Sequence, residues 1–132
     1  MDNETLRQKA CGHEFAEAKL RLESALKLRN IPVFARFDHA QNAREAGLEL
    51  APCIVFVFGN PKVGTLLMQE RPDVALELPL RFLLWKDAMG TVQLAWKDPL
   101  MLAREYGLAE GNPTVVAMHD LMESLAQEVC VY

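Results

Sequence analysis

The stretch that decides the fold is Cys53-Ile54-Val55-Phe56-Val57-Phe58, an apolar run that passes into the loop Gly59-Asn60-Pro61-Lys62. Apolar residues in succession predict a strand that is buried on both faces, at the centre of a sheet. Asn60 can cap a helix whose first position is Pro61, and Pro72 ends that helix. A junction of this kind can hold a ligand, because the N–H groups at a helix start are unpaired.

Four elements are predicted before this stretch. Residues 6–11 indicate a short edge strand. Apolar residues at helical spacing predict a helix over 14–30, which ends at Asn30 because asparagine tolerates the left-handed C-cap. Residues 33–37 alternate as a strand does. Asp38 and Gly47 then have the positions of an N-cap and a C-cap, which predicts a short helix between them.

The chain after Pro72 predicts a hairpin followed by two helices. Residues 78–85 and 91–96 are strands around the turn 87–90. Asp98-Pro99 opens a helix that reaches Gly107, and Asn112-Pro113 opens a longer C-terminal helix over 112–130. The hairpin and the short connections favour an α+β fold over a doubly wound parallel sheet. We expect a single domain over 1–132, a two-layer sandwich with a mainly antiparallel sheet of about five strands and helices on one face.

Composition disfavours several classes of partner. The 132 residues are 51% apolar and 24% charged, as in an ordinary globular domain. A net charge of −4 disfavours nucleic acid and anionic membranes as partners. No apolar run approaches the ~20 residues of a membrane span. The opening residues Met1-Asp2-Asn3-Glu4 lack the basic and apolar regions of a secretory signal, so we expect a cytoplasmic protein.

The cysteines are Cys11, Cys53 and Cys130, and no two of them form a Cys-x-x-Cys pair. Their odd number fits a reducing compartment better than a disulfide scaffold, so free thiols are favoured over a Cys11–Cys130 bridge. No histidine or cysteine spacing signals a metal site, and no motif identifies a cofactor.

Four segments together resemble the domain-of-unknown-function 302 family. These are Val33-Phe34-Ala35-Arg36-Phe37-Asp38-His39-Ala40, Phe58-Gly59-Asn60-Pro61-Lys62-Val63-Gly64-Thr65-Leu66-Leu67-Met68, Leu78-Pro79-Leu80-Arg81 and Trp85-Lys86-Asp87. The resemblance covers roughly residues 15–107. It implies a compact α+β domain of the TATA-binding-protein-like kind and a homodimer. It implies no activity, because the function of the family is not established.

The chain departs from the family pattern in three places. Asn30 stands where glycine is usual, and Glu77 stands where aspartate is usual. Residues 1–13 match poorly, which places the first strand in doubt.

The loop between Gly59 and Gly64 has the glycine spacing of a P-loop. It lacks the lysine after the second glycine, and Pro61 removes one N–H that would cradle phosphate. Nucleotide hydrolysis is therefore disfavoured. A tight strand-to-helix turn is the favoured interpretation, and capture of an anion by Lys62 and the helix start is the alternative.

Polar residues at strand ends are the candidate ligand-binding site: Asp38, His39, Asn60, Lys62 and Asp87. No residue is predicted to be catalytic, because no complete catalytic constellation is present. We expect a small homodimer that binds a partner or a small anionic or apolar ligand. The alternative is an enzyme for an anionic metabolite, with His39 as acid/base and Lys62 holding the anion; it requires these two side chains to converge.

Overall fold

The computed structural model describes residues 6–131. Strands and helices alternate over the first half of the described chain, and a hairpin and two helices complete the second half. The elements are β1 (Leu6–Cys11), α1 (Phe15–Leu28), β2 (Val33–Asp38), α2 (His39–Glu45), β3 (Cys53–Phe58), α3 (Pro61–Glu70), the 3₁₀ helix η1 (Pro72–Glu77), β4 (Leu80–Lys86), β5 (Val92–Lys97), α4 (Pro99–Glu105) and α5 (Pro113–Cys130).

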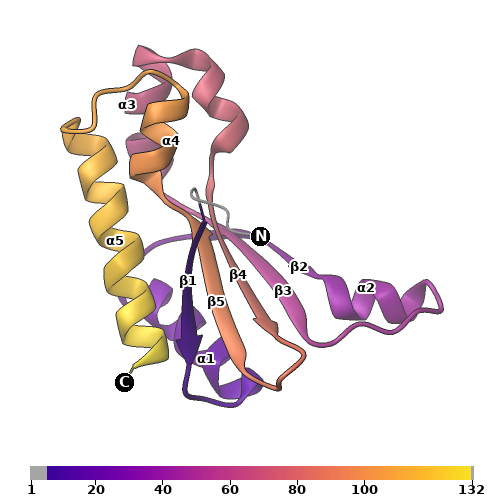
Figure 1. The fold of residues 1–132 in the computed structure, drawn as a ribbon. Coiled ribbons are helices and arrows are strands. Elements are labelled where there is room, and N and C mark those ends of the chain that lie inside the picture. The colour runs from indigo at the N-terminus through magenta and orange to yellow at the C-terminus, as the bar shows by residue number, and fades with distance from the viewer. Residues whose placement is uncertain (1–5, 132) are drawn as a thin grey trace.

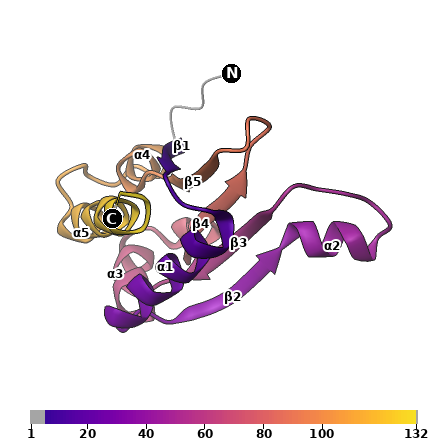
Figure 2. The ribbon, with the colours of Figure 1, turned by 90° about the horizontal axis from the view of Figure 1, so that it is seen from below.

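The described strands form one sheet in the order β1-β5-β4-β3-β2. Every pairing in it is antiparallel, and consecutive β3, β4 and β5 are neighbours. Helices α1, α3 and α5 gather on one side of the sheet (Figure 2). Helix α2 projects away from the rest of the molecule, beyond the ends of β2 and β3 (Figure 1). The two-layer α+β fold expected from the sequence is confirmed.

The core lies between the sheet and the helices that cover it. Ile54, Phe56 and Phe58 of β3 are buried on that side, with Leu26 of α1 and Leu125 of α5 in the same apolar cluster. The other side chains of β3 point to the opposite face and are only half-buried. The sequence predicted a strand buried on both faces, and the structure corrects this. Strand β3 is interior to the sheet, but helices cover only one of its faces.

Capping residues begin and end the helices where the sequence places them. Asn30 has φ 55° after α1, and Gly47 has φ 78° after α2. Asp38 caps α2 by accepting the N–H of Gln41 at 2.9 Å. These local signals explain why most predicted boundaries agree with the structure within two residues.

The region between α3 and β4 differs from the prediction. Pro72 ends α3 as expected, but a 3₁₀ helix over Pro72–Glu77 follows it, and β4 begins at Leu80 where residue 78 was expected. Short 3₁₀ helices lack the apolar periodicity that marks longer helices. Leu6–Cys11 does form an edge strand, paired with β5. Residues 1–5, which belong to the poorly matching start of the chain, lie outside the described residues.

Cys11 and Cys130 form a disulfide, which corrects the expectation of free thiols. The two cysteines are 119 residues apart in sequence, and both are buried. The end of β1 lies against the end of α5, where the N–H of Gly12 also donates to the carbonyl of Cys130 at 3.4 Å. The number of cysteines carried no information about this proximity. Cys53 remains a free thiol whose pKa is raised by partial burial and by the nearby charge of Asp38.

Candidate functional site

The five sequence-predicted site residues lie at two opposite ends of β3. Asp38 pairs with Ile54 at the start of β3, and His39 follows it. Asp87 follows β4 at the same end, because Trp85 pairs with Cys53. Asn60 and Lys62 follow the other end of β3, roughly 20 Å away at about 3.3 Å per residue. The structure therefore does not bring His39 and Lys62 together.

The carboxylates at the first end stabilise local backbone structure. Asp87 accepts hydrogen bonds from Gln93 Nε2 at 3.1 Å, from the Thr91 N–H at 2.9 Å and from the Met89 N–H at 3.0 Å. These bonds, that of Gln93 first, lower the pKa of Asp87. Asp38 is occupied as the N-cap of α2, and His39 is exposed on that helix. Asp38, His39 and Asp87 line neither of the two pockets described below.

The start of α3 has no N–H group left for an anion. Pro61 has no N–H, and the N–H of Lys62 donates to Asn60 Oδ1 at 3.0 Å. The N–H groups of Val63 and Gly64 both donate to the Asn60 carbonyl, at 3.0 and 3.1 Å. This loop therefore has the bonding of a tight strand-to-helix turn.

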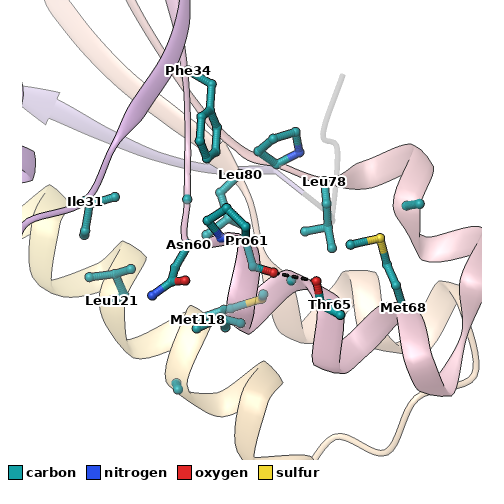
Figure 3. A pocket seen from close by; sticks show the side chains of 16 residues that line it. Ile31, Phe34, Asn60, Pro61, Thr65, Met68, Leu78, Leu80, Met118 and Leu121 are labelled. Carbon is teal, nitrogen blue, oxygen red and sulfur yellow. Dashed lines mark hydrogen bonds between the residues drawn. The ribbon is translucent and has the colours of Figure 1, made fainter.

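A pocket of about 480 Å³ opens beside this turn (Figure 3). The β3–α3 loop, α3, the start of β2, the β4 approach and α5 contribute to it. Its wall is largely aliphatic and aromatic. Labelled in Figure 3 among the lining side chains are Ile31, Phe34, Met68, Leu78, Met118 and Leu121. Lys62 is exposed and does not line it, so the pocket favours an apolar ligand over an anionic one.

Two polar side chains can orient a ligand in this pocket. Asn60 uses Oδ1 to accept the N–H of Lys62, and its amide Nδ2 has no hydrogen-bond partner within residues 6–131. In Figure 3 this amide points toward the side of the pocket formed by Met118 and Leu121. Thr65 donates its hydroxyl proton to the Pro61 carbonyl at 2.7 Å, which leaves its oxygen able to accept. The pocket thus offers one donor and one acceptor in an apolar wall.

Asn60 is therefore the predicted site residue that the structure places in a pocket. The other walls come from Ile31 and Phe34, before and within β2, and from Met118 and Leu121 on α5. The sequence shows that these residues are apolar. It led to the prediction of a strand in the first segment and of a core-facing stripe in the C-terminal helix, and not of a pocket. Phe34 is 47% exposed in the structure, and the sequence carried no signal that its ring lies at a pocket.

A buried carboxylate joins the last two helices. Asp98 is 8% exposed and caps α4 by accepting the N–H of Leu100 at 3.0 Å. The same oxygen lies 3.0 Å from His119 Nδ1 on α5. Neither side chain lines the pocket, and the pair holds α4 against α5.

Among residues 6–131, no group of three His, Cys, Asp or Glu side chains is arranged to hold a metal ion. Within the same residues, no helix has the length and apolar character needed to cross a bilayer.

Comparison with known proteins gives a family match and a solved structure of the same fold. The model of the family described as "Domain of unknown function DUF302" matches residues 7–128. The crystal structure of an uncharacterized conserved protein DUF302 from Bacillus stearothermophilus superposes with a TM-score of 0.84. It covers 97% of this chain and 99% of that one at 19% identity, a level that supports the fold alone.

Curated relatives are similar over part of their length. Two proteins named fluoride-specific ion channel FluC 1, from Brucella suis biovar 1 (strain 1330) and Brucella abortus biovar 1 (strain 9-941), are each 43% identical over 104 residues. The match covers 79% of this chain but 41% and 38% of those proteins. The chain therefore spans about two fifths of the curated relatives that it matches.

Proposed function

Because the chain belongs to the DUF302 family, whose description assigns no activity, we propose a function from its own pockets and surfaces. The function is the binding of a small, mainly apolar molecule between the β3–α3 turn and α5. The pocket of about 480 Å³ is the observation that supports this, since small-molecule sites commonly measure about 300–1,000 Å³ and have apolar walls with few polar groups. The ligand would accept a hydrogen bond from Asn60 and donate one to Thr65.

Filling the pocket tests this proposal. N-phenyl-1-naphthylamine, a neutral fluorescent probe, is expected to bind the native protein with increased emission. Leucine at Gly64 extends into the pocket, because a Cβ there lies 3.5 Å from Leu78 Cδ1 and 3.8 Å from Met68 Cε, which are ordinary contacts. We expect Gly64→Leu to weaken probe binding at least about tenfold, or 1.4 kcal/mol.

Gly111→Leu is the matched control. Gly111 has open space around its Cβ position and lies outside the pocket, so probe binding should be unchanged. The proposal would be refuted if the native protein gave no saturable emission, or if Gly64→Leu bound the probe as tightly as the native chain.

We also propose that the chain forms a homodimer through the sheet face that no helix covers. Phe37, Val55 and Leu83 stand in one row of paired residues across β2, β3 and β4, and Phe37 is 49% exposed while the other two are half-buried. Their neighbours Val57 and Trp85 on this face are also apolar and half-buried. The solvent face of an antiparallel sheet is ordinarily polar, so an apolar row there supports a partner, and a second copy is the simplest one.

Light scattering tests the dimer. The native chain should have about twice the mass of one chain, and Phe37→Asp, which places a charge in the row, should be monomeric. Phe37 is 49% exposed and does not line the pocket beside α3. Leu20→Asp is the control, because Leu20 is 61% exposed on α1, away from the face. A monomeric native chain at working concentration would rule the dimer out.

Two other functions are not proposed. The enzyme alternative needs His39 and Lys62 to converge, and they lie at opposite ends of β3. Ion conduction is not proposed because it is named for the FluC relatives, and the match to this chain covers only 41% and 38% of those proteins.

The disulfide also bears on the cellular location of the protein. Disulfides persist in oxidising compartments, so the Cys11–Cys130 bond does not support the cytoplasmic location that the cysteine count favoured. We propose instead a compartment oxidising enough to maintain it.

A further inference from the structure

Strands β4 and β5 pair only near their hairpin turn. The ladder between them runs from Lys86 and Val92 to Leu83 and Ala95 and stops there. Both strands continue further on their other sides, since β4 pairs with β3 as far as Leu80 and β5 pairs with β1 as far as Lys97. The sheet therefore forks between β4 and β5, although its outer ladders are complete.

A second cavity, of about 250 Å³, lies in this fork. Its apolar wall includes Leu83 and Ala95, where the ladder ends, and Leu102 and Met122 from α4 and α5. An engineered apolar cavity of about 150 Å³ holds benzene, so this one has room for a ring or a short chain with a polar group. It shares Leu80 with the pocket beside α3, and Val55 and Leu83 with the row proposed for the dimer, but this inference rests on neither proposal.

Charged side chains form one wall of the fork. Glu77 Oε1 lies 2.7 Å from Lys97 Nζ, and Glu77 Oε2 accepts the hydroxyl proton of Tyr106 at 3.2 Å. Lys97 also lies 3.4 Å from a carboxylate oxygen of Glu105. The bond with Lys97 lowers the pKa of Glu77, and the same bond raises the pKa of Lys97, so both are ionised near neutrality. Glu77 and Lys97 therefore neutralise each other's charge as an ion pair.

Arg81 is the remaining charge in the lining. Its guanidinium has no hydrogen bond or ion pair within residues 6–131 and lies near enough to contribute to the lowered pKa of Glu77. Arg81 ends the Leu78-Pro79-Leu80-Arg81 segment. Unlike the three residues before it, Arg81 does not line the pocket beside α3. A guanidinium binds a carboxylate in a planar, two-bond arrangement.

A buried donor completes the site. Trp96 lines the fork, is 4% exposed, and its indole Nε1 has no hydrogen-bond partner within residues 6–131. Buried polar groups in proteins are nearly always paired, so an unpaired indole N–H on a residue that lines a cavity favours an acceptor in that cavity. Inorganic anions would satisfy Arg81 and Trp96 but leave the apolar wall without contacts.

We propose that the fork between β4 and β5 binds a small monocarboxylate with an apolar body. The carboxylate pairs with Arg81 and accepts the Trp96 N–H, and the apolar body lies against Leu83, Ala95, Leu102 and Met122.

Nuclear magnetic resonance of the ¹⁵N-labelled full chain tests this directly, with benzoate as the probe and benzamide as its uncharged analogue. The chain has two tryptophans, so its indole N–H region contains one reporter in the fork, Trp96, and one on the open sheet face, Trp85. Benzoate should shift the Trp96 signal saturably. Benzamide should bind at least about tenfold more weakly, a difference of 1.4 kcal/mol.

Arg81→Gln should weaken benzoate binding at least about tenfold. Arg44→Gln, which changes an exposed arginine on α2, should not. The inference is overturned if the Trp96 signal does not saturate by about 10 mM benzoate, or if Arg81→Gln binds benzoate as the native chain does. Two cross-tests separate a failure of this inference from a failure of the proposed function. Arg81→Gln should bind N-phenyl-1-naphthylamine as the native chain does, and Gly64→Leu should bind benzoate as the native chain does.

Discussion

Replacing both Cys11 and Cys130 with serine is expected to lower the free energy of unfolding by about 5 kcal/mol and the melting temperature by about 15 °C. The disulfide closes a loop of 119 residues, nearly the whole chain, and the chain-entropy gain from a cross-link grows with loop length. A domain is typically stable by only about 5–15 kcal/mol, so the loss is a large fraction of the total. Thermal and urea unfolding measure it.

The double variant should still fold at low temperature. Arg21 holds the end of α5 independently of the disulfide, because its Nε donates to the Val129 carbonyl and its Nη2 to the Glu128 carbonyl, each at 2.9 Å. Cys53→Ser is the control, since it removes the free thiol and leaves the bond. Titration of thiols in the denatured native chain should find one per chain; finding three would show that the bond does not form.

Phe82→Ala is expected to lower the free energy of unfolding by about 3–5 kcal/mol. The Phe82 ring is fully buried, stacks on Phe58 with 5.3 Å between centroids and forms a T-shaped pair with Trp96 with 5.5 Å between centroids. Removing it leaves a cavity between β3, β4 and β5, where the surrounding side chains can close only in part. The midpoint of urea unfolding should fall while its slope stays constant.

Leu20→Ala is the control for this effect. Leu20 is 61% exposed on α1, and its truncation should change stability by no more than about 0.5 kcal/mol. A comparable loss in both variants would contradict the placement of Phe82 at the centre of the core.

The helix ends could be predicted from the sequence because capping interactions act over only a few residues. Asn30, Asp38, Asn60 and Asn112 were expected at helix ends, and each has that role in the structure. The antiparallel hairpin between β4 and β5 was predicted for the same reason, since a turn of four residues left few alternatives.

The candidate site was only partly readable because its walls meet through long-range packing. Asn60 was predicted as a ligand residue from the same signal that makes it a cap. Nothing in the spacing of Phe34 and Met118 indicates that a residue of β2 and one of α5 face the same cavity. The disulfide was missed for a related reason, because the odd number of cysteines describes a composition and not the contact between Cys11 and Cys130.

The fork in the sheet also marks the line along which we expect the domain to open into two parts. One contains β2, β3 and β4, and the other contains β1 and β5, which the disulfide joins to α5. Backbone amides along the fork lack ladder partners, so sub-global opening should begin there and separate the two parts before either of them unfolds. A molecule held between Arg81 and Trp96 would bridge both parts, and occupancy of the fork would then slow amide exchange throughout the sheet.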